Sequence, residues 1–245
     1  MINIKKYLPV LLVILISGCA DPNEPLSPPK DNQWITVEGV APKYTKPSVS
    51  AVYISKDCLK SQWHADMSLY KVPSYHGLRL DVKADPQTGY FQTKLPFNGG
   101  GWCKWKIDRA FVSVSYTDVS HLVKDAALYD GGGGTGLTAF INDAIQTSSS
   151  ETAALNTIDF SPVIYPVLEL SVNFPKSIFL QGEMGMHPFR LKLTPGAEWK
   201  IIYKPKLDET KMPKVTITNG KGEWVEYPNG HIETKTQMVD TRYIK

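Results

Sequence analysis

The chain has 245 residues, a formal net charge of +3 and 42% apolar residues. This length suits one large domain or two small ones, and the apolar content is that of a globular protein rather than a disordered one. The nearly balanced charge gives no basic surface of the kind that binds nucleic acid, so we expect no nucleic-acid partner.

The first 18 residues have the form of a bacterial export signal. Two lysines precede the apolar run Tyr7–Ile16, which is about half as long as a membrane-spanning helix. The segment Ile16–Cys19 (ISGC) then resembles the lipobox of bacterial lipoproteins, although Ile16 stands where that family prefers Leu. The resemblance implies that signal peptidase II removes residues 1–18 and that lipid is attached to Cys19. The alternative is an ordinary secretory signal followed by a free cysteine.

The lipobox resemblance also implies a location. In lipoproteins two or three acyl chains give stable membrane attachment, and Asp directly after the modified cysteine retains the protein at the inner membrane. Here Ala20 follows Cys19, so the resemblance implies an outer-membrane anchor with the domain facing the periplasm. Residues 19–33 are polar and proline-rich, which predicts a disordered tether.

From Trp34 to about Asp118 the sequence predicts short strands rich in Val, Ile, Tyr and Phe. The turn cluster Asp85–Gly89 (DPQTG) separates two of them and predicts a hairpin. This succession resembles transthyretin-type or immunoglobulin-like modules over about 80 residues, which implies a β-sandwich. The predicted strands are Trp34–Val40, Ser48–Ser55, Gly77–Lys83, Tyr90–Leu95 and Ala110–Tyr116.

The middle of the chain, about residues 119–157, predicts a small helical insertion. Apolar residues recur with helical spacing in Asp118–Tyr129 and in Leu137–Gln146. Ser148–Glu151 has the form of a capping box before a further short helix.

A glycine run lies between the two predicted helices. A nucleotide-binding P-loop needs Lys and then Ser or Thr after its last glycine, whereas Leu and Thr follow here. The run therefore predicts a flexible hinge or flap, with backbone binding of an anion at the next helix start as the alternative. The glycines of this loop are Gly131, Gly132, Gly133 and Gly134.

Strand signals return after residue 158. The turns Asn219–Gly222 and Pro228–Gly230 contain Asn-Gly, which readily adopts the positive φ of tight hairpins. They predict a three-stranded meander over Val215–Thr236. Three other strands are predicted at Val167–Phe174, Phe189–Thr194 and Glu198–Lys204.

The fold class predicted from these elements is mainly β. We expect β-sandwich-like antiparallel sheets, the helical insertion at about 119–157, and the C-terminal β-meander. The folded region 34–245 is either one unit or three parts, at 34–118, 119–157 and 158–245.

Two cysteines remain once Cys19 is lipidated. The oxidising periplasm favours a disulfide between Cys58 and Cys103, and the loop that it closes predicts about 4 kcal/mol of stabilisation. The alternative is two separate buried thiols. The spacing does not match a zinc site, so we expect no metal.

The sequence shows no catalytic motif. It contains no Gly-x-Ser-x-Gly elbow, and no pair of histidines has the helical spacing of a metalloprotease. A pair of carboxylates could still meet in space as in a glycosidase. We expect no enzyme activity and no cofactor, with surface or loop positions for His64, His76, His121, His187 and His231.

Aromatic residues cluster around the two cysteines. Trp and Tyr on loops are favoured anchors for protein partners, whereas a Trp packed on a disulfide is also normal in the core of a sandwich. The candidate partner-binding residues are Trp102, Trp105, Trp63 and Tyr75.

These features predict a periplasm-facing lipoprotein that binds a protein. Its outline resembles immunity lipoproteins that neutralise antibacterial effectors, such as lipases delivered by type VI secretion. The alternative is a structural subunit of an envelope or secretion apparatus, because transthyretin-like secretion-system lipoproteins share the outline. A hydrolase is the third reading.

Overall fold

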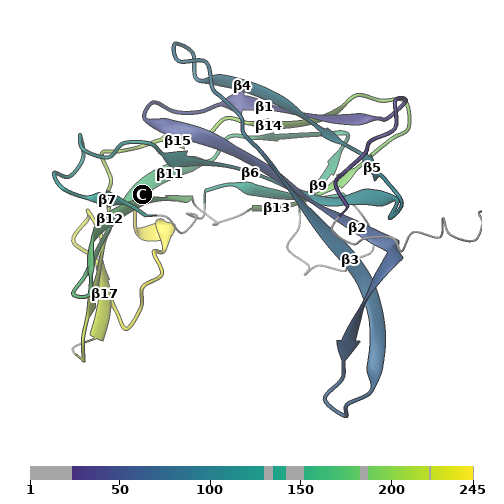
Figure 1. Ribbon diagram of the computed structural model, residues 1–245. Helices are drawn as coiled ribbons and strands as arrows, with labels where there is room; N and C mark the ends of the chain where they lie inside the picture. The colour runs from purple at the N-terminus through teal and green to yellow at the C-terminus, as the bar shows by residue number, and fades with distance from the viewer. Residues whose placement is uncertain (1–23, 130–134, 142–151, 183–186, 221, 245) are drawn as a thin grey trace, which may run out of the picture.

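The computed structural model describes residues 24–129, 135–141, 152–182, 187–220 and 222–244. Over these residues the chain forms three β-sheets and a short 3-10 turn, η3 (Thr241–Tyr243), and no α-helix (Figure 1). The predicted mainly β fold is confirmed. The export signal, Cys19 and the Gly131–Gly134 loop lie outside the described residues.

Sheet 1 covers one side of the body. Its two central strands, one beginning at Trp34 and the other at Trp199, come from distant parts of the chain and pair in parallel. The strand order is β10 (Thr157–Phe160), β14 (Trp199–Tyr203), β1 (Trp34–Val40) and β4 (Tyr90–Pro96).

Sheet 2 is the larger layer of the body. Its strands β2 and β3 continue beyond the body as a long hairpin (Figure 1). The strand order is β3 (Leu69–Leu80), β2 (Thr45–Trp63), β6 (Trp105–Tyr116), β8 (Leu137–Phe140), β13 (His187–Lys192) and β9 (Thr152–Leu155), and β5 (Asn98–Gly100) also pairs with β6.

The main core lies between sheets 1 and 2. Alternate residues of each strand point into it, as the period of two along a strand requires. Within sheet 1, β1 and β14 approach closely at Gly39, where an added Cβ would lie 1.9 Å from the carbonyl oxygen of its pairing partner Tyr203. Fully buried core residues include Ile35, Val37, Leu95 and Ile201 from sheet 1, and Val49, Tyr53, Ala110, Val112 and Leu137 from sheet 2.

Sheet 3 forms the other projection of the molecule. It has a second, smaller apolar cluster, where Ile244, close to the C-terminus, packs with Val167, Val215 and Val225. The predicted meander is confirmed, because β16, β17 and β18 pair in antiparallel order. The strand order is β18 (Ile232–Thr234), β17 (Gly222–Glu226), β16 (Lys214–Thr218), β11 (Val163–Ser171), β12 (Phe174–Gly182) and β7 (Ala127–Leu128), and β15 (Lys206–Leu207) pairs with β11.

The predicted helical insertion is wrong wherever the structure describes it. Leu137–Phe140 is a strand, hydrogen-bonded to β6 on one side and β13 on the other. Its residues Leu137, Thr138 and Ala139 are all buried, and such a short central strand has an apolar run that periodicity alone cannot tell from a helix. The capping-box residues 148–151 lie outside the described residues, and β9 follows them in place of a helix.

The first predicted helix, Asp118–Tyr129, is also absent. The Asp118 carboxylate accepts hydrogen bonds from the amide and hydroxyl of Ser120, and the chain makes turns at Val119–Val123. Asp125 then takes a positive φ of 59°, a conformation that a helix does not tolerate in its interior. Local side-chain bonds and a left-handed residue therefore override the helical spacing.

Two predictions about strand pairing also need correction. The predicted sheets are antiparallel, whereas β1–β14, β11–β16 and β13–β8 are parallel pairs.

The predicted hairpin around Asp85–Gly89 has the predicted turn, but the strands before and after the turn do not pair with each other. The Asp85 carboxylate accepts hydrogen bonds from Thr88, yet β3 pairs with β2 and β4 pairs with β1. The turn is a corner between the two layers.

Candidate functional site

The disulfide forms the corner from which the long hairpin projects. Cys58 and Cys103 are bonded, with their Cα atoms 5.2 Å apart, as predicted. The buried Ser55 hydroxyl donates to the Cys103 carbonyl and accepts from the Cys58 amide at 2.9 Å. Lys104 and Asp57 add an exposed ion pair at 3.6 Å. These bonds join β2 to the turn before β6.

The N-terminal segment also reaches this corner. A Glu24 carboxylate oxygen accepts a hydrogen bond from the Trp102 amide at 2.8 Å. The Ser27 amide donates to the Gly99 carbonyl at 2.7 Å, and Leu26 packs against the main core. The segment that the structure describes from Glu24 onward therefore lies along the domain, which differs from the disordered tether predicted for 19–33.

The four candidate aromatic residues occupy different environments. Trp102 is 76% exposed, Trp63 is 67% exposed and Tyr75 is 45% exposed. Trp105, in contrast, is fully buried in the main core near the His76 ring. Trp105 therefore cannot contact a partner in this structure, and the reading of a Trp packed behind the disulfide is the right one for this residue.

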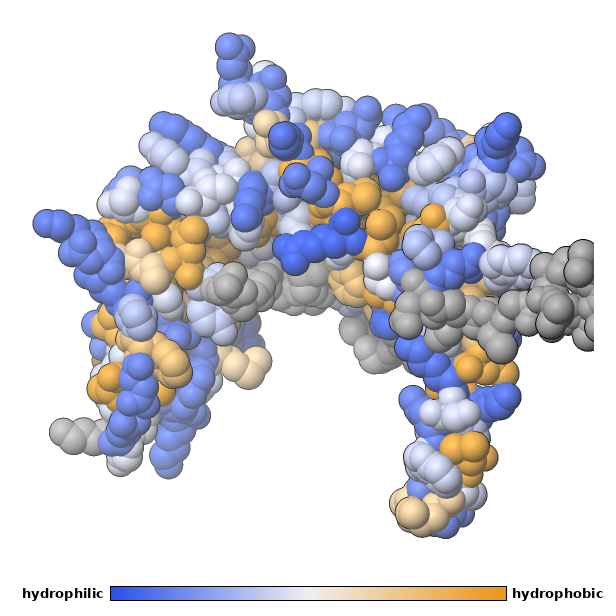
Figure 2. All heavy atoms as spheres, viewed as in Figure 1, coloured by the Kyte–Doolittle hydropathy of each residue, from blue (hydrophilic) through white to orange (hydrophobic). Residues whose placement is uncertain are grey.

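The projecting hairpin carries most of the other exposed apolar residues of this region. We call the part beyond the disulfide, residues 59–73, the arm. Leu59 pairs with Pro73 and Trp63 with Leu69, whereas the pairing between β2 and β6 ends at Ile54. The arm is thus a two-stranded ribbon that leaves the body (Figure 1), and hydrophobic residues stand among hydrophilic ones along it (Figure 2).

The exposed apolar residues of the arm lie on one face, together with the paired residues Ser61 and Lys71. Residues that pair directly across an antiparallel ribbon lie on the same side, so Leu59, Trp63, Leu69 and Pro73 share a face, and Tyr75 continues it by strand alternation. Leu59 is 47% exposed and Leu69 is 56% exposed. An isolated hairpin is marginally stable in water, and these side chains are exposed on a ribbon that has no second layer packed on it among the described residues.

The opposite face of the arm is bonded internally. The His64 and Tyr70 rings stack with centroids 3.9 Å apart, and the Tyr70 hydroxyl donates to Gln62 at 2.8 Å. At the tip, the Asp66 carboxylate accepts from the Ser68 hydroxyl and amide, which lower the pKa of Asp66. The two faces therefore differ: one has its own partners and the other presents apolar surface to solvent.

Comparisons with known proteins give no match. Neither a family model, nor a curated protein, nor a solved structure is significantly similar to this chain.

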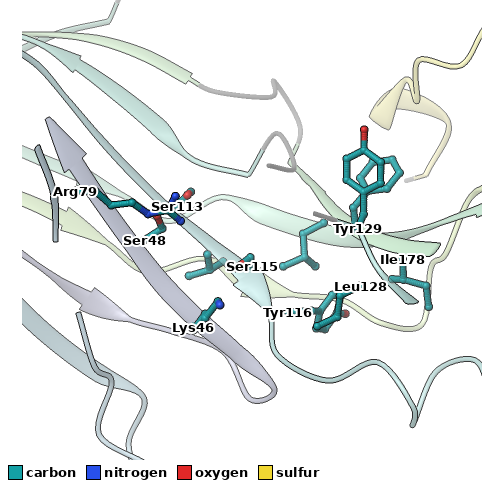
Figure 3. Close-up of a pocket in the computed structure, with 12 residues that line it drawn as sticks. Lys46, Ser48, Arg79, Ser113, Ser115, Tyr116, Leu128, Tyr129 and Ile178 are labelled. Atoms are coloured by element: carbon teal, nitrogen blue, oxygen red, sulfur yellow. The ribbon is translucent and has the colours of Figure 1, made fainter. Parts of the chain in front are cut away.

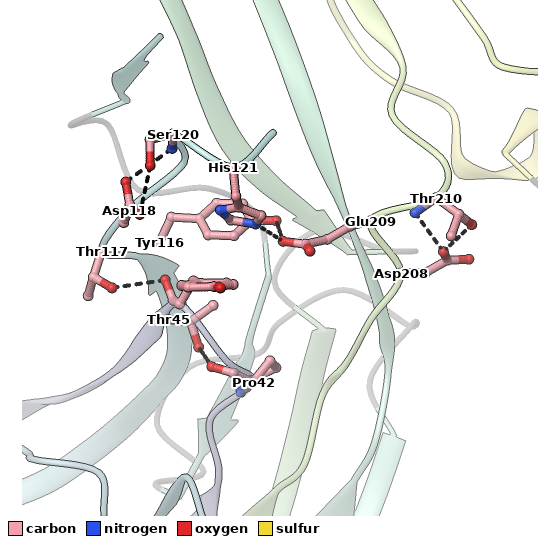
Figure 4. Close-up of polar contacts among 11 residues, drawn as sticks. Pro42, Thr45, Tyr116, Thr117, Asp118, Ser120, His121, Asp208, Glu209 and Thr210 are labelled. Atoms are coloured by element: carbon pink, nitrogen blue, oxygen red, sulfur yellow. Dashed lines mark hydrogen bonds and ion pairs between the residues drawn. The ribbon is translucent and has the colours of Figure 1, made fainter. Parts of the chain in front are cut away.

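A second polar cluster joins Tyr44, Tyr116, His121 and Glu209 (Figure 4). One Glu209 carboxylate oxygen accepts from the Tyr116 hydroxyl at 2.8 Å and lies 2.9 Å from Nε2 of His121. The Tyr44 ring stacks on His121 with centroids 4.1 Å apart. Burial and the Glu209 bond raise the pKa of Tyr116, which keeps its hydroxyl protonated. The cluster joins three distant segments, and we interpret it as a structural clasp.

Two further findings concern metals and membrane spans. Among the described residues, no three His, Cys, Asp or Glu side chains gather closely enough to hold a metal ion. The part of the chain that the structure describes contains no helix long and apolar enough to cross a membrane.

Trp63 and Tyr75 were predicted as partner-binding residues, whereas Leu59, Leu69 and the tip residue Met67, which is 76% exposed, were not. Leu59 and Trp63, which point to the same side of a strand, are followed by a turn and by Leu69, and this arrangement fits a hairpin. The polar residues between them weaken the strand pattern in the sequence.

Proposed function

We propose that this protein is a lipid-anchored protein of the bacterial envelope that acts by binding another protein through its arm. The apolar face of Leu59, Trp63, Leu69 and Tyr75 supports the proposal, because Trp and Tyr in an exposed apolar setting are typical of binding energy hot spots. The lipobox resemblance of Ile16–Cys19 supports the anchor.

The backbone of the arm favours a protein over a small molecule. The β2 half of the arm has β3 as its partner on one side, and the described residues place no strand on its other side. β3 is likewise the outermost described strand of sheet 2. Open strand edges pair with extended segments of other chains, so a partner could use the apolar face and an edge together.

Immunity is the more specific role that we propose. Neutralising an incoming effector requires a tight binding surface held near the membrane that the effector attacks, and it requires no chemistry. The alternative role, a subunit of an envelope or secretion apparatus, is favoured by the open edges, because strand addition also builds assemblies. Both roles use the arm.

The experiment compares two faces of the arm. The double variant Trp63→Ser/Leu69→Ser removes the apolar face, and the control Val72→Ser changes the opposite face of the same ribbon. We expect the first to lose affinity for a co-encoded partner by about tenfold or more, as hot-spot truncation does, while the control retains it. Equal binding by both variants would overturn the proposal.

The two roles separate in cells. Deleting the gene should make cells sensitive to a neighbouring effector if the protein confers immunity, and the Trp63→Ser/Leu69→Ser chain should fail to restore resistance. Full resistance of the deletion strain, together with retained binding of the arm to envelope proteins, would favour the apparatus role instead.

A further inference from the structure

A groove lies between sheet 2 and the edge of sheet 3, away from the arm's tip and from the disulfide. It has a volume of about 270 Å³. One wall is the outer face of sheet 2, where β2, β3 and β6 lie side by side, and the other wall is formed by β7 and β12 (Figure 3). This volume suits a small ligand or one end of a larger molecule.

The sheet 2 wall is cationic and rich in hydroxyls. Lys46 pairs with Ser115 and Ser48 pairs with Ser113 across β2 and β6, so all four side chains share one face. Arg79 joins them from β3, and in Figure 3 its side chain extends toward Ser48 and Ser113. Two cations and three hydroxyls therefore line one wall.

These polar groups have no partners within the described chain. None of the five side chains makes a hydrogen bond or an ion pair with another described residue, and no Asp or Glu is among the described residues that line the groove. Some exposed carboxylates elsewhere have partners within the chain, as at Asp66 and Asp85. An anion bound in this groove would supply the opposite charge that the lining residues lack.

The facing wall is largely apolar. It is lined by Leu128 and Tyr129, at the end of β7, and by Ile178, Phe179 and Leu180 of β12. The Tyr129 ring packs on Phe179 with centroids 5.4 Å apart, which fixes its position. An inorganic ion would leave this wall unused, whereas an anion attached to an organic body would contact both walls.

We propose that this groove binds the phosphate ester of a small polyol. The Arg79 guanidinium suits phosphate oxygens because it presents a planar fork of donors, and Lys46 adds a second charge. Ser48, Ser113 and Ser115 can each donate to or accept from the hydroxyls of a polyol. Glycerol phosphate has this chemistry, both as a free molecule and as a phospholipid headgroup.

The test uses the mature chain, residues 19–245, with Cys19→Ser so that it carries no lipid. Calorimetric titration compares glycerol 3-phosphate, inorganic phosphate and glycerol. We expect glycerol 3-phosphate to bind most tightly, and Arg79→Gln or Lys46→Gln to weaken it about tenfold or more, as loss of a charged hydrogen bond does. Lys60→Gln, an exposed cation on the arm, is the matched control and should bind like wild type.

Vesicles distinguish the source of the ester. If the groove takes a lipid headgroup, phosphatidylglycerol vesicles should retain the protein and phosphatidylcholine vesicles should not, with Arg79→Gln abolishing the difference. Retention that Arg79→Gln leaves unchanged overturns the lipid form of the proposal. Equal affinity for inorganic phosphate and glycerol 3-phosphate, or unchanged affinity in both groove variants, overturns the site itself.

Discussion

Reducing the Cys58–Cys103 disulfide should lower the stability of the folded chain substantially. The two cysteines are 45 residues apart in sequence, and a cross-link that closes a loop of this length removes entropy from the unfolded chain worth about 4 kcal/mol. For a domain of this size each kcal/mol corresponds to about 2–4 °C, so the unfolding temperature should fall by about 8–16 °C.

The assay is thermal and urea-induced unfolding of the lipid-free chain, with and without reductant. The double variant Cys58→Ala/Cys103→Ala is the matched control, because reductant should not change its unfolding midpoint. We also expect reduction to speed hydrogen exchange at the Cys58 amide, which donates to the Ser55 hydroxyl at the base of the arm. If the oxidised and reduced chains unfold at the same urea concentration, the cross-link contributes no stability and the reasoning is refuted.

Three further outcomes are expected in the same unfolding assay. Gly39→Ala should cost more than about 2 kcal/mol because its Cβ would meet backbone, while Gly77→Ala, with nothing within 4 Å, should fold normally. Trp105→Ala should cost about 3–5 kcal/mol, whereas the exposed Trp63→Ala should change stability by less than about 0.5 kcal/mol. Hydrogen bonds from its turn lower the pKa of Asp85 below the usual 3.8. The ionised carboxylate therefore stabilises the fold above pH 3.8, and this stabilisation is lost as the pH falls through the lowered pKa. The stability of Asp85→Asn should depend less on acid pH than that of the wild type, and an unchanged acid profile would contradict this.

The sequence predicts well those elements whose conformation is determined by residues close together in the chain. Trp34–Val40 matches β1, because its alternating apolar residues suffice to define a half-buried strand. The meander follows from its Asn-Gly turns, where Gly220 and Gly230 have positive φ. The disulfide was predictable because Cys58 and Cys103 are the two cysteines of the chain besides Cys19.

The features that the sequence misses depend on distant parts of the chain. Leu137–Phe140 has helical spacing but becomes a strand because β6 and β13 offer partners on both sides. The parallel pairing of β1 with β14 joins residues more than a hundred positions apart, and no local pattern encodes it. The groove of Lys46 and Arg79 likewise exists only once β2, β3 and β6 are neighbours.

The contacts of the N-terminal segment limit how far the folded domain can lie from the proposed lipid anchor. If Cys19 carries lipid, the five-residue step from Cys19 to Glu24 can span at most about 18 Å, because an extended residue spans about 3.3–3.6 Å. The disulfide corner and Trp102, whose amide Glu24 binds, would then lie close to the membrane. The arm begins at that same corner and extends about 20 Å from it by strand geometry. A partner bound to Trp63 and Leu69 would therefore be held within a few tens of ångströms of the bilayer, which is what the proposed immunity role against a lipid-attacking effector would use.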